Sequence, residues 1–188
     1  MVDGEEKTQD VGLITRRKSI RLKHYDYAEP GMYFVTICTQ NKKCLFGNIV
    51  DGAMRLNDCG EIVRQTWNDL PNHYRNVGLD MCMIMPNHFH GIIMLTDGVG
   101  PDPNTNVGAG FKPAPTTKHG LSEIVRGFKT FSSRRINVLR CTPDASVWQR
   151  NFYECVIRNE RELFEIQEYI QNNPLKWDLD PENVYAQT

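Results

Sequence analysis

Residues 79–95 have the sequence LDMCMIMPNHFHGIIML, and this stretch decides the fold. Two short apolar runs, 79–85 and 88–95, lie on either side of Pro86 and Asn87. Each run has the length of a β-strand rather than that of a helix. Proline and asparagine are typical of the turn that joins two such strands. We therefore expect two neighbouring strands here, paired antiparallel.

His88 and His90 stand at the start of the second run, with Phe89 between them. Side chains alternate faces along a strand, so both imidazoles project from one face, from Cα atoms about 6.6 Å apart. That spacing lets two ring nitrogens meet on one cation at about 2 Å each. The strand is otherwise apolar, and two ionisable rings cost desolvation there unless a partner satisfies them. A metal site is one interpretation of the pair, and hydrogen-bonded histidines without a metal are the other.

The other elements follow from apolar periodicity, turn residues and helix caps. In chain order the sequence predicts a strand at 32–39, a hairpin at 47–56, a helix opened by Asp58 and Glu61 and stopped by Pro71, a helix at 121–139, a strand at 151–157 and a helix from Asn159 to about Asn172. The helix at 121–139 should turn Leu121, Ile124, Phe128 and Phe131 inward. This order predicts an α+β sandwich, ferredoxin-like, with helices packed on a mostly antiparallel sheet.

Bulk properties indicate one ordinary globular domain of 188 residues. No apolar stretch approaches the roughly 20 residues of a membrane helix, and the acidic start is unlike a signal peptide. We expect a cytoplasmic protein without a membrane contact. The six cysteines lie scattered singly, which predicts free thiols rather than a disulfide framework.

The chain divides into a predicted disordered leader at 1–15, a single domain at 16–181 and a tail at 182–188. Residues 97–117 are dense in glycine, proline, asparagine and threonine, and they predict a long flexible loop within the domain.

The charges are segregated along the chain, although the net charge is only −1. One basic cluster includes Arg16 and Arg17, and a second lies on the helix at 121–139. Such a footprint is compatible with binding phosphates, although a solvated helix face is the commoner explanation of one run. The candidate phosphate-contacting residues are Arg16, Arg17, Arg126, Lys129, Arg134 and Arg135.

Tyr169 lies in the last predicted helix, at the border of the buried stripe formed by Leu163, Ile166 and Ile170. There its ring can pack while its hydroxyl reaches an open site, or it can simply pack. Asn173 follows one turn later and carries an amide oxygen, but it precedes Pro174 and is therefore disfavoured in helical geometry.

Three separated blocks, at 85–92, 148–153 and 169–174, together resemble REP-associated tyrosine transposases of the HUH superfamily. The resemblance covers about residues 16–181. It implies an HUH endonuclease type of fold, Tyr169 as nucleophile, and a divalent ion, Mg²⁺ or Mn²⁺, on His88 and His90. The third ligand of the family maps onto Asn173. Arg150, in the second block, joins the candidate DNA-contacting residues.

The resemblance further implies that the protein cleaves and rejoins single-stranded DNA at short palindromic hairpins, through a 5′-phosphotyrosine. Two other functions remain open. One is a domesticated binder of palindromic DNA or RNA that does not cut. The other is a hydrolytic metal nuclease, which needs further carboxylates near the histidines, where the sequence offers only Asp80 and Asp97. The protein could act as a monomer or as a homodimer.

Overall fold

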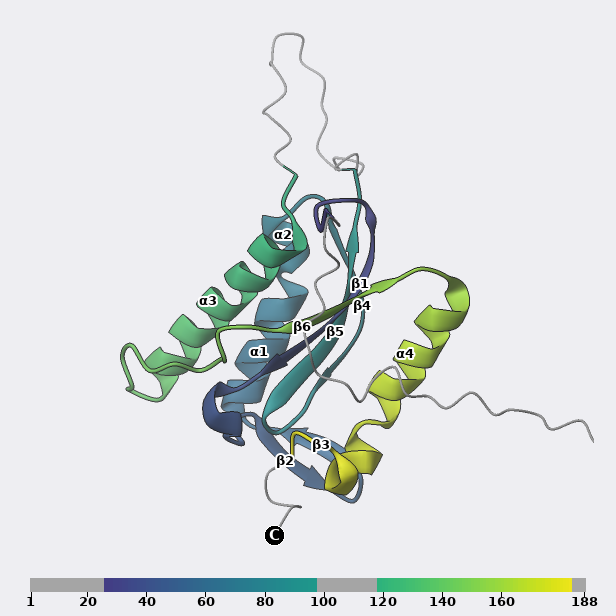
Figure 1. The fold of residues 1–188 in the computed structure, drawn as a ribbon. Helices are drawn as coiled ribbons and strands as arrows, with labels where there is room; N and C mark the ends of the chain where they lie inside the picture. The colour runs from purple at the N-terminus through teal and green to yellow at the C-terminus, as the bar shows by residue number, and fades with distance from the viewer. Residues whose placement is uncertain (1–25, 98–117, 184–188) are drawn as a thin grey trace, which may run out of the picture.

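The computed structural model describes residues 26–97 and 118–183, which form a sheet with helices on both faces (Figure 1). The predicted leader, Arg16, Arg17, residues 98–117 of the predicted loop and residues 184–188 lie outside the described residues. The elements are β1 (Gly31–Cys38), η1 (Gln40–Lys42), β2 (Gly47–Val50), β3 (Ala53–Leu56), α1 (Asp58–Asn68), α2 (Leu70–His73), β4 (Val77–Ile84), β5 (His88–Leu95), α3 (Leu121–Leu139), β6 (Tyr153–Ile157), α4 (Glu160–Asn172) and η2 (Pro174–Leu179).

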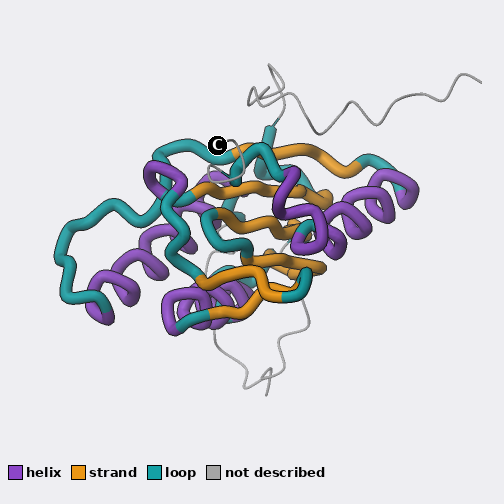
Figure 2. Tube along the Cα trace, turned by 90° about the horizontal axis from the view of Figure 1, so that it is seen from below, coloured by secondary structure: helices purple, strands orange, loops and turns teal. Residues whose placement is uncertain are grey.

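The main sheet has the strand order β4-β5-β1-β6, and every neighbouring pair in it is antiparallel. β2 and β3 form a separate hairpin. The chain passes through β1, α1, β4, β5, α3 and β6 in turn, which is the ferredoxin-like arrangement of two βαβ halves. Seen from below, the strands form a central layer between helices (Figure 2). The predicted fold class is confirmed.

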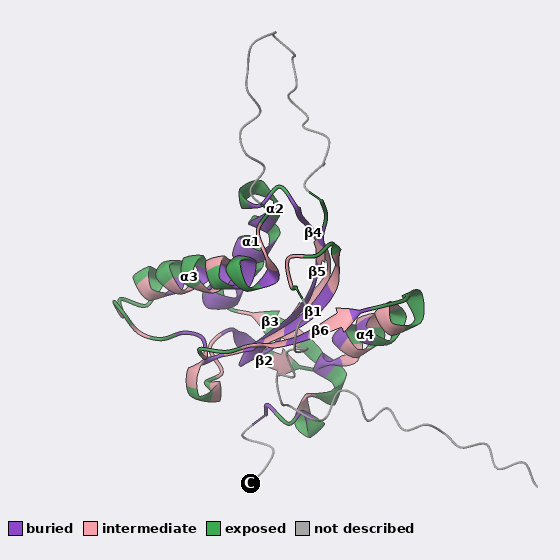
Figure 3. Cartoon of the chain, turned by 45° about the horizontal axis from the view of Figure 1, so that its top comes forward, coloured by how far each residue is buried: buried purple, intermediate pink, exposed green. Residues whose placement is uncertain are grey.

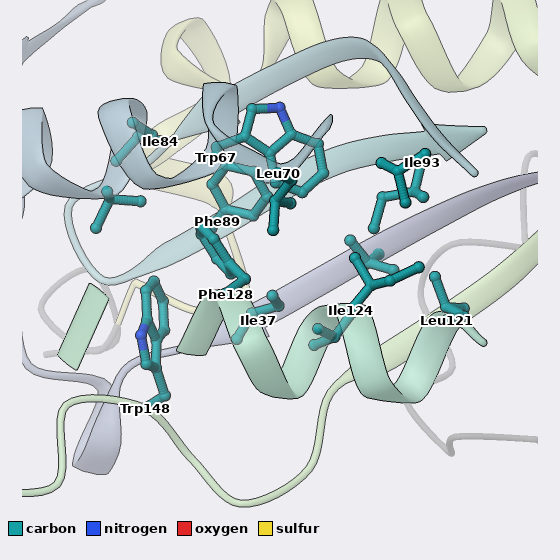
Figure 4. Close-up of a cluster of buried hydrophobic side chains, with 14 of the residues drawn as sticks. Ile37, Trp67, Leu70, Ile84, Phe89, Ile93, Leu121, Ile124, Phe128 and Trp148 are labelled. Carbon is teal, nitrogen blue, oxygen red and sulfur yellow. The ribbon is translucent and has the colours of Figure 1, made fainter. Parts of the chain in front are cut away.

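The larger core lies between the sheet and the pair α1 and α3. Trp67 from α1, Phe89 from β5 and Phe128 from α3 meet there, with ring centroids 4.6–5.6 Å apart (Figure 4). All three side chains are fully buried, and aromatic rings of this size dominate the free energy gained from burial. The exposed residues of α3 lie on its outer face (Figure 3).

A smaller core lies on the opposite face of the sheet, beneath α4. It consists of Phe34, Ile92, Ile157, Ile166 and Ile170. The apolar stripe predicted for the last helix is confirmed, since Ile166 and Ile170 are buried. The predicted cap is confirmed as well, because the side chain of Asn159 accepts a hydrogen bond from the backbone N–H of Glu162 at the start of α4.

Two helix details differ from the sequence prediction. The cap of α1 is Asn57, whose side chain accepts the backbone N–H of Gly60, so Asp58 is the first helical residue and not the cap. α1 ends at Asn68, and Pro71 lies in the first turn of the short helix α2, where its missing N–H is no loss.

The inward face of α3 is narrower than predicted. Leu121, Ile124 and Phe128 are buried as expected, but Phe131 is 44% exposed. Its ring stacks on His73 of α2, with centroids 5.7 Å apart. Phe131 therefore packs against α2 at the surface instead of entering the core.

All six cysteines are free, as predicted, although only Cys59 is fully buried and Cys141 is exposed. Within residues 26–97 and 118–183, the structure contains no helix whose length and apolar character would suit a membrane span.

Gly91 generates a stability prediction, because a Cβ there would lie 2.7 Å from the Trp67 ring. Gly91→Ala should lower the free energy of unfolding by about 1–3 kcal/mol, since the core must shift to admit the methyl group. Urea denaturation followed by circular dichroism measures this change.

Gly31→Ala is the matched control, since its Cβ would meet only the Tyr33 ring at an ordinary 3.6 Å. It should change stability by no more than about 0.5 kcal/mol. Equal effects of the two substitutions would show that the Trp67 contact does not restrict position 91.

Candidate metal centre and nucleic-acid interface

His88 and His90 lie at the start of β5 and share the face of the sheet that α4 covers. Their ring centroids are 4.5 Å apart, and the two side chains are essentially inaccessible to solvent. Both histidines belong to a strand that pairs on each side, with β1 and with β4. Their backbone positions are therefore rigidly set, as a preorganised site requires.

A hydrogen bond to Nδ1 orients each imidazole ring. His88 Nδ1 lies 2.9 Å from Asn87 Oδ1, and His90 Nδ1 lies 2.8 Å from Thr36 Oγ1. An amide oxygen can only accept, so the proton of neutral His88 is on Nδ1 and its lone pair is on Nε2. Such hydrogen bonds to the second nitrogen are usual for histidines that ligate metals.

Asn87 also connects the histidines to the end of the described chain. Its Nδ2 donates to the carbonyl oxygens of Lys42, at 3.2 Å, and Glu182, at 2.6 Å. The Glu182 carboxylate in turn pairs with Lys42 Nζ at 3.0 Å. Glu182 and Asn183 are buried, although the sequence assigned both to a tail, so the folded domain extends at least to Asn183.

Asp180 joins the histidines in one cluster. Its Oδ2 lies 3.8 Å from His88 Nε2, and the ligand atoms of His88, His90 and Asp180 all lie within 4.8 Å of one another. This cluster of two imidazoles and one carboxylate could bind a metal ion. Asp180 was not predicted from the sequence, because nothing in local spacing relates it to β5.

The acidic residues that the sequence analysis considered have other contacts. Asp80 Oδ1 accepts a hydrogen bond from Gln167 Nε2 at 2.8 Å, and Asp97 pairs with Lys118 at 2.7 Å. Neither belongs to the cluster with His88 and His90.

Tyr169 packs beside the histidines. Its half-buried ring lies 5.2 Å from the His90 ring and meets the Phe34 ring edge-on at 6.1 Å, measured between centroids. Asn173 follows one turn later, and its φ of −59° and ψ of −43° keep it in the helical register despite Pro174. Tyr169 and Asn173 therefore lie on the same side of the end of α4.

The side-chain oxygen of Asn173 has no hydrogen-bond partner among the described residues. The side chain of Asn173 is also buried. An amide oxygen in this state costs free energy unless a partner such as a cation satisfies it.

Tyr153 is the other tyrosine on this face of the sheet. It pairs with Thr36 across β1 and β6, and its ring lies 6.3 Å from the Phe34 ring. Burial raises the pKa of Tyr153, and the neighbouring Cys155 adds to the effect. A hydroxyl with a raised pKa is a poorer nucleophile, which agrees with the sequence interpretation that Tyr153 mainly packs.

A basic groove, here called the α3 groove, lies between α3 and residues 141–154. It has a volume of about 1240 Å³, and its lining includes Arg126, Lys129, Arg134 and Arg150. Lys129 Nζ also donates to the carbonyl oxygens of Gln149 and Arg150, and burial lowers its pKa. The structure thus brings together four of the predicted DNA-contacting residues.

Arg135 is placed elsewhere. Its guanidinium hydrogen-bonds to Thr66 Oγ1 and Gln65 Oε1, so it ties α3 to α1 rather than lining the α3 groove.

Comparison with known proteins shows which proteins the chain resembles. No protein-family model matches the chain. A Haemophilus influenzae protein of uncharacterised function is 44% identical over 172 residues, which cover 89% of this chain and 93% of that protein. A second H. influenzae protein, provisionally named a REP-associated tyrosine transposase, is 24% identical over 151 residues, covering 80% of this chain and 74% of that protein.

A solved structure of a REP-associated tyrosine transposase bound to a REP hairpin has the same fold. Its TM-score is 0.55 and its identity 18%, over 84% of this chain and 78% of that chain. The chain is similar in sequence and in fold to REP-associated tyrosine transposases. The resemblance stated from the sequence is confirmed.

Asn87 generates a prediction about how the centre is held together. Asn87→Ala should lower the free energy of unfolding by about 1–3 kcal/mol, because it leaves His88 Nδ1 and the Glu182 carbonyl without this partner in the interior. Chemical denaturation of the two proteins gives the difference.

Asn72→Ala is a suitable comparison, because Asn72 makes its hydrogen bond to Asp69 at the exposed surface. It should cost no more than about 0.5 kcal/mol. If Asn87→Ala is as mild as this control, Asn87 does not anchor residues 180–183.

Proposed function

We propose that this protein cleaves and rejoins single-stranded DNA at hairpins, with Tyr169 as nucleophile. The supporting observation is the packing of the Tyr169 ring against the His90 ring, 5.2 Å away, beside a buried pair of histidines. Tyrosine and potential metal ligands thereby come from α4 and β5, which are distant in sequence, to one face of the sheet.

We further propose that His88, His90 and Asn173 hold a divalent ion, Mg²⁺ or Mn²⁺. Imidazole and amide oxygen donors with open positions suit these ions. Bound there, the ion would polarise the oxygens of the scissile phosphate. The chain's own groups orient the two rings, since Asn87 and Thr36 hydrogen-bond to Nδ1 of His88 and His90 and leave Nε2 of each ring out of these contacts.

Tyr169 carries the covalent step. The free phenol has a pKa of about 10, so it must lose its proton as it attacks. The tyrosine oxygen forms a bond to phosphorus, the bond from phosphorus to the 3′-oxygen breaks, and that oxygen takes up a proton. The product is a 5′-phosphotyrosine with a free 3′-hydroxyl. Because one ester replaces another, the 3′-hydroxyl of a strand can reverse the step without ATP.

The DNA would be held by its phosphates. The relative of known structure is bound to a REP hairpin, and we propose the same class of partner here. Arg126, Arg134 and Arg150 line the α3 groove and could contact phosphates, which positions DNA without specifying its sequence. Arg16 and Arg17 remain proposed contacts.

Two alternative functions would leave the DNA in different states. A domesticated protein would bind hairpins and never cut them. A hydrolytic nuclease would use a metal-bound water, and Asp180 provides a carboxylate near the histidines for this alternative. Hydrolysis shortens the DNA but leaves none attached to protein, so covalent capture together with the length of the oligonucleotide separates all three.

Tyr169→Phe should abolish covalent capture of a hairpin oligonucleotide in Mn²⁺, because phenylalanine has no oxygen to form the ester. Binding of the hairpin should persist. Denaturing gel electrophoresis detects the protein–DNA adduct, and a mobility shift measures binding.

Tyr153→Phe is the control, since it removes a hydroxyl from the same face of the sheet and should retain the adduct. An adduct formed by the Tyr169→Phe protein would place the nucleophile elsewhere. Hairpin binding by the wild type without any adduct and without any shortened oligonucleotide would favour the domesticated binder.

The double variant Arg126→Ala, Arg150→Ala should weaken hairpin binding to a similar degree for all sequences. The slope of log affinity against log salt should fall by about 0.9 for each lost phosphate contact. Titration by fluorescence anisotropy at several salt concentrations measures both effects.

Arg161→Ala is the control for loss of positive charge, because Arg161 is exposed on α4 and pairs only locally with Glu165. Its affinity and salt slope should match those of the wild type. If it weakens binding as much as the double variant, the α3 groove has no special role.

A further inference from the structure

We infer that Asp180 is a further ligand of the metal, supplied by the segment that follows Pro174. This inference rests on the proposed metal-dependent function and deepens it. It adds a carboxylate to a donor set of two neutral imidazoles and one neutral amide, and it makes residues 174–183 part of the metal centre.

The distance between Asp180 and His88 suits a shared ion better than a direct contact. Asp180 Oδ2 and His88 Nε2 are 3.8 Å apart, beyond the range of about 3.2 Å for such a hydrogen bond. Two ligands about 2.1 Å from one ion lie about 3 Å apart at right angles and about 4.2 Å apart when opposite. The observed separation falls between these two values.

His90 completes the arrangement. The ligand atoms of all three side chains lie within 4.8 Å of one another, so side-chain movements of under about 1 Å bring them to one octahedral ion. The lone pair of His88 is on Nε2, the atom that faces Asp180, because Nδ1 donates to Asn87.

The carboxylate is held in place by its own segment. Asp180 Oδ1 accepts the backbone N–H of Glu182 at 2.6 Å, which leaves Oδ2 as the oxygen directed at His88. The Glu182 carbonyl is bound by Asn87, and the Asn183 side chain donates to Trp177 O at 3.0 Å. Asp180 is therefore positioned by contacts on both sides of it in sequence.

The negative charge of the Asp180 carboxylate would favour binding of a divalent ion. A divalent ion at a buried site is costly unless anionic ligands offset it, and carboxylates favour Mg²⁺ and Mn²⁺. Since His88, His90 and Asn173 carry no charge as ligands, one carboxylate halves the net charge of the site. Affinity in oxygen-ligand sites rises with the number of charged ligands.

The first test measures Mn²⁺ binding to the full chain by electron paramagnetic resonance of free Mn²⁺. Asp180→Asn should weaken the affinity at least tenfold. Asp178→Asn removes the same charge from an exposed position of η2 and should stay within twofold of the wild type. Equal or tighter binding by Asp180→Asn would overturn the inference.

A second variant keeps the test informative if Asp180→Asn unfolds. Asp180→Cys places a thiolate at the same position, and thiolates bound to Co²⁺ or Cd²⁺ give charge-transfer absorption in the ultraviolet. Difference spectra against the wild type, which has six cysteines of its own, should show a new band. Asp178→Cys should show none. No band in a folded Asp180→Cys protein would overturn the inference.

The wild type separates this inference from the function on which it rests. If the wild type binds no Mn²⁺, the metal-dependent function itself fails. If the wild type and Asp180→Asn bind Mn²⁺ equally and both capture DNA, the function stands and only the role of Asp180 fails. Hydrogen exchange adds a structural readout, since Mn²⁺ should slow exchange in residues 174–183 of the wild type but not of Asp180→Asn.

Discussion

The two-residue alternation of side chains along β5 is the constraint on which both the core and the metal centre depend. Phe89 and Ile93 enter the core against α1 and α3, while His88, His90 and Ile92 face α4. β5 is paired along both edges, so its register is locked. A slip of one residue would exchange the two faces and bury the imidazoles among Trp67 and Phe128. The same hydrogen bonds that stabilise the sheet therefore aim the histidines.

Much of this could be predicted because it depends on residues close together in sequence. Period-two alternation predicted that His88 and His90 share a face, and apolar spacing predicted the exact span of α3. Tyr169 was singled out by its place on the border of the α4 stripe and by the family blocks, and the structure brings its ring to His90. The Asn159 cap was likewise visible in the local sequence.

The features that escaped prediction all depend on contacts between distant segments. Asp180 reaches the histidines only because residues 180–183 pack against Asn87, and no local pattern encodes that contact. Arg135 was predicted to contact DNA like the other basic residues of α3, but its guanidinium hydrogen-bonds to Gln65 and Thr66 of α1. Phe131 fits the apolar period of α3 but lies beyond the edge of the core. At Asn57, two adjacent residues could each cap α1, and propensity alone does not choose between them.

Tyr169, Asn173 and Asp180 follow His88 and His90 in the chain, and this order has a consequence for when the proposed site is complete. Synthesis proceeds from the N-terminus, and domains fold as their segments emerge. The histidine-bearing strand is made well before α4 and η2. If these groups act as proposed, a nascent chain in which only β5 has been made holds His88 and His90 but not yet the nucleophile Tyr169. A chain that stops before Tyr169 would therefore carry both histidines and lack the proposed nucleophile.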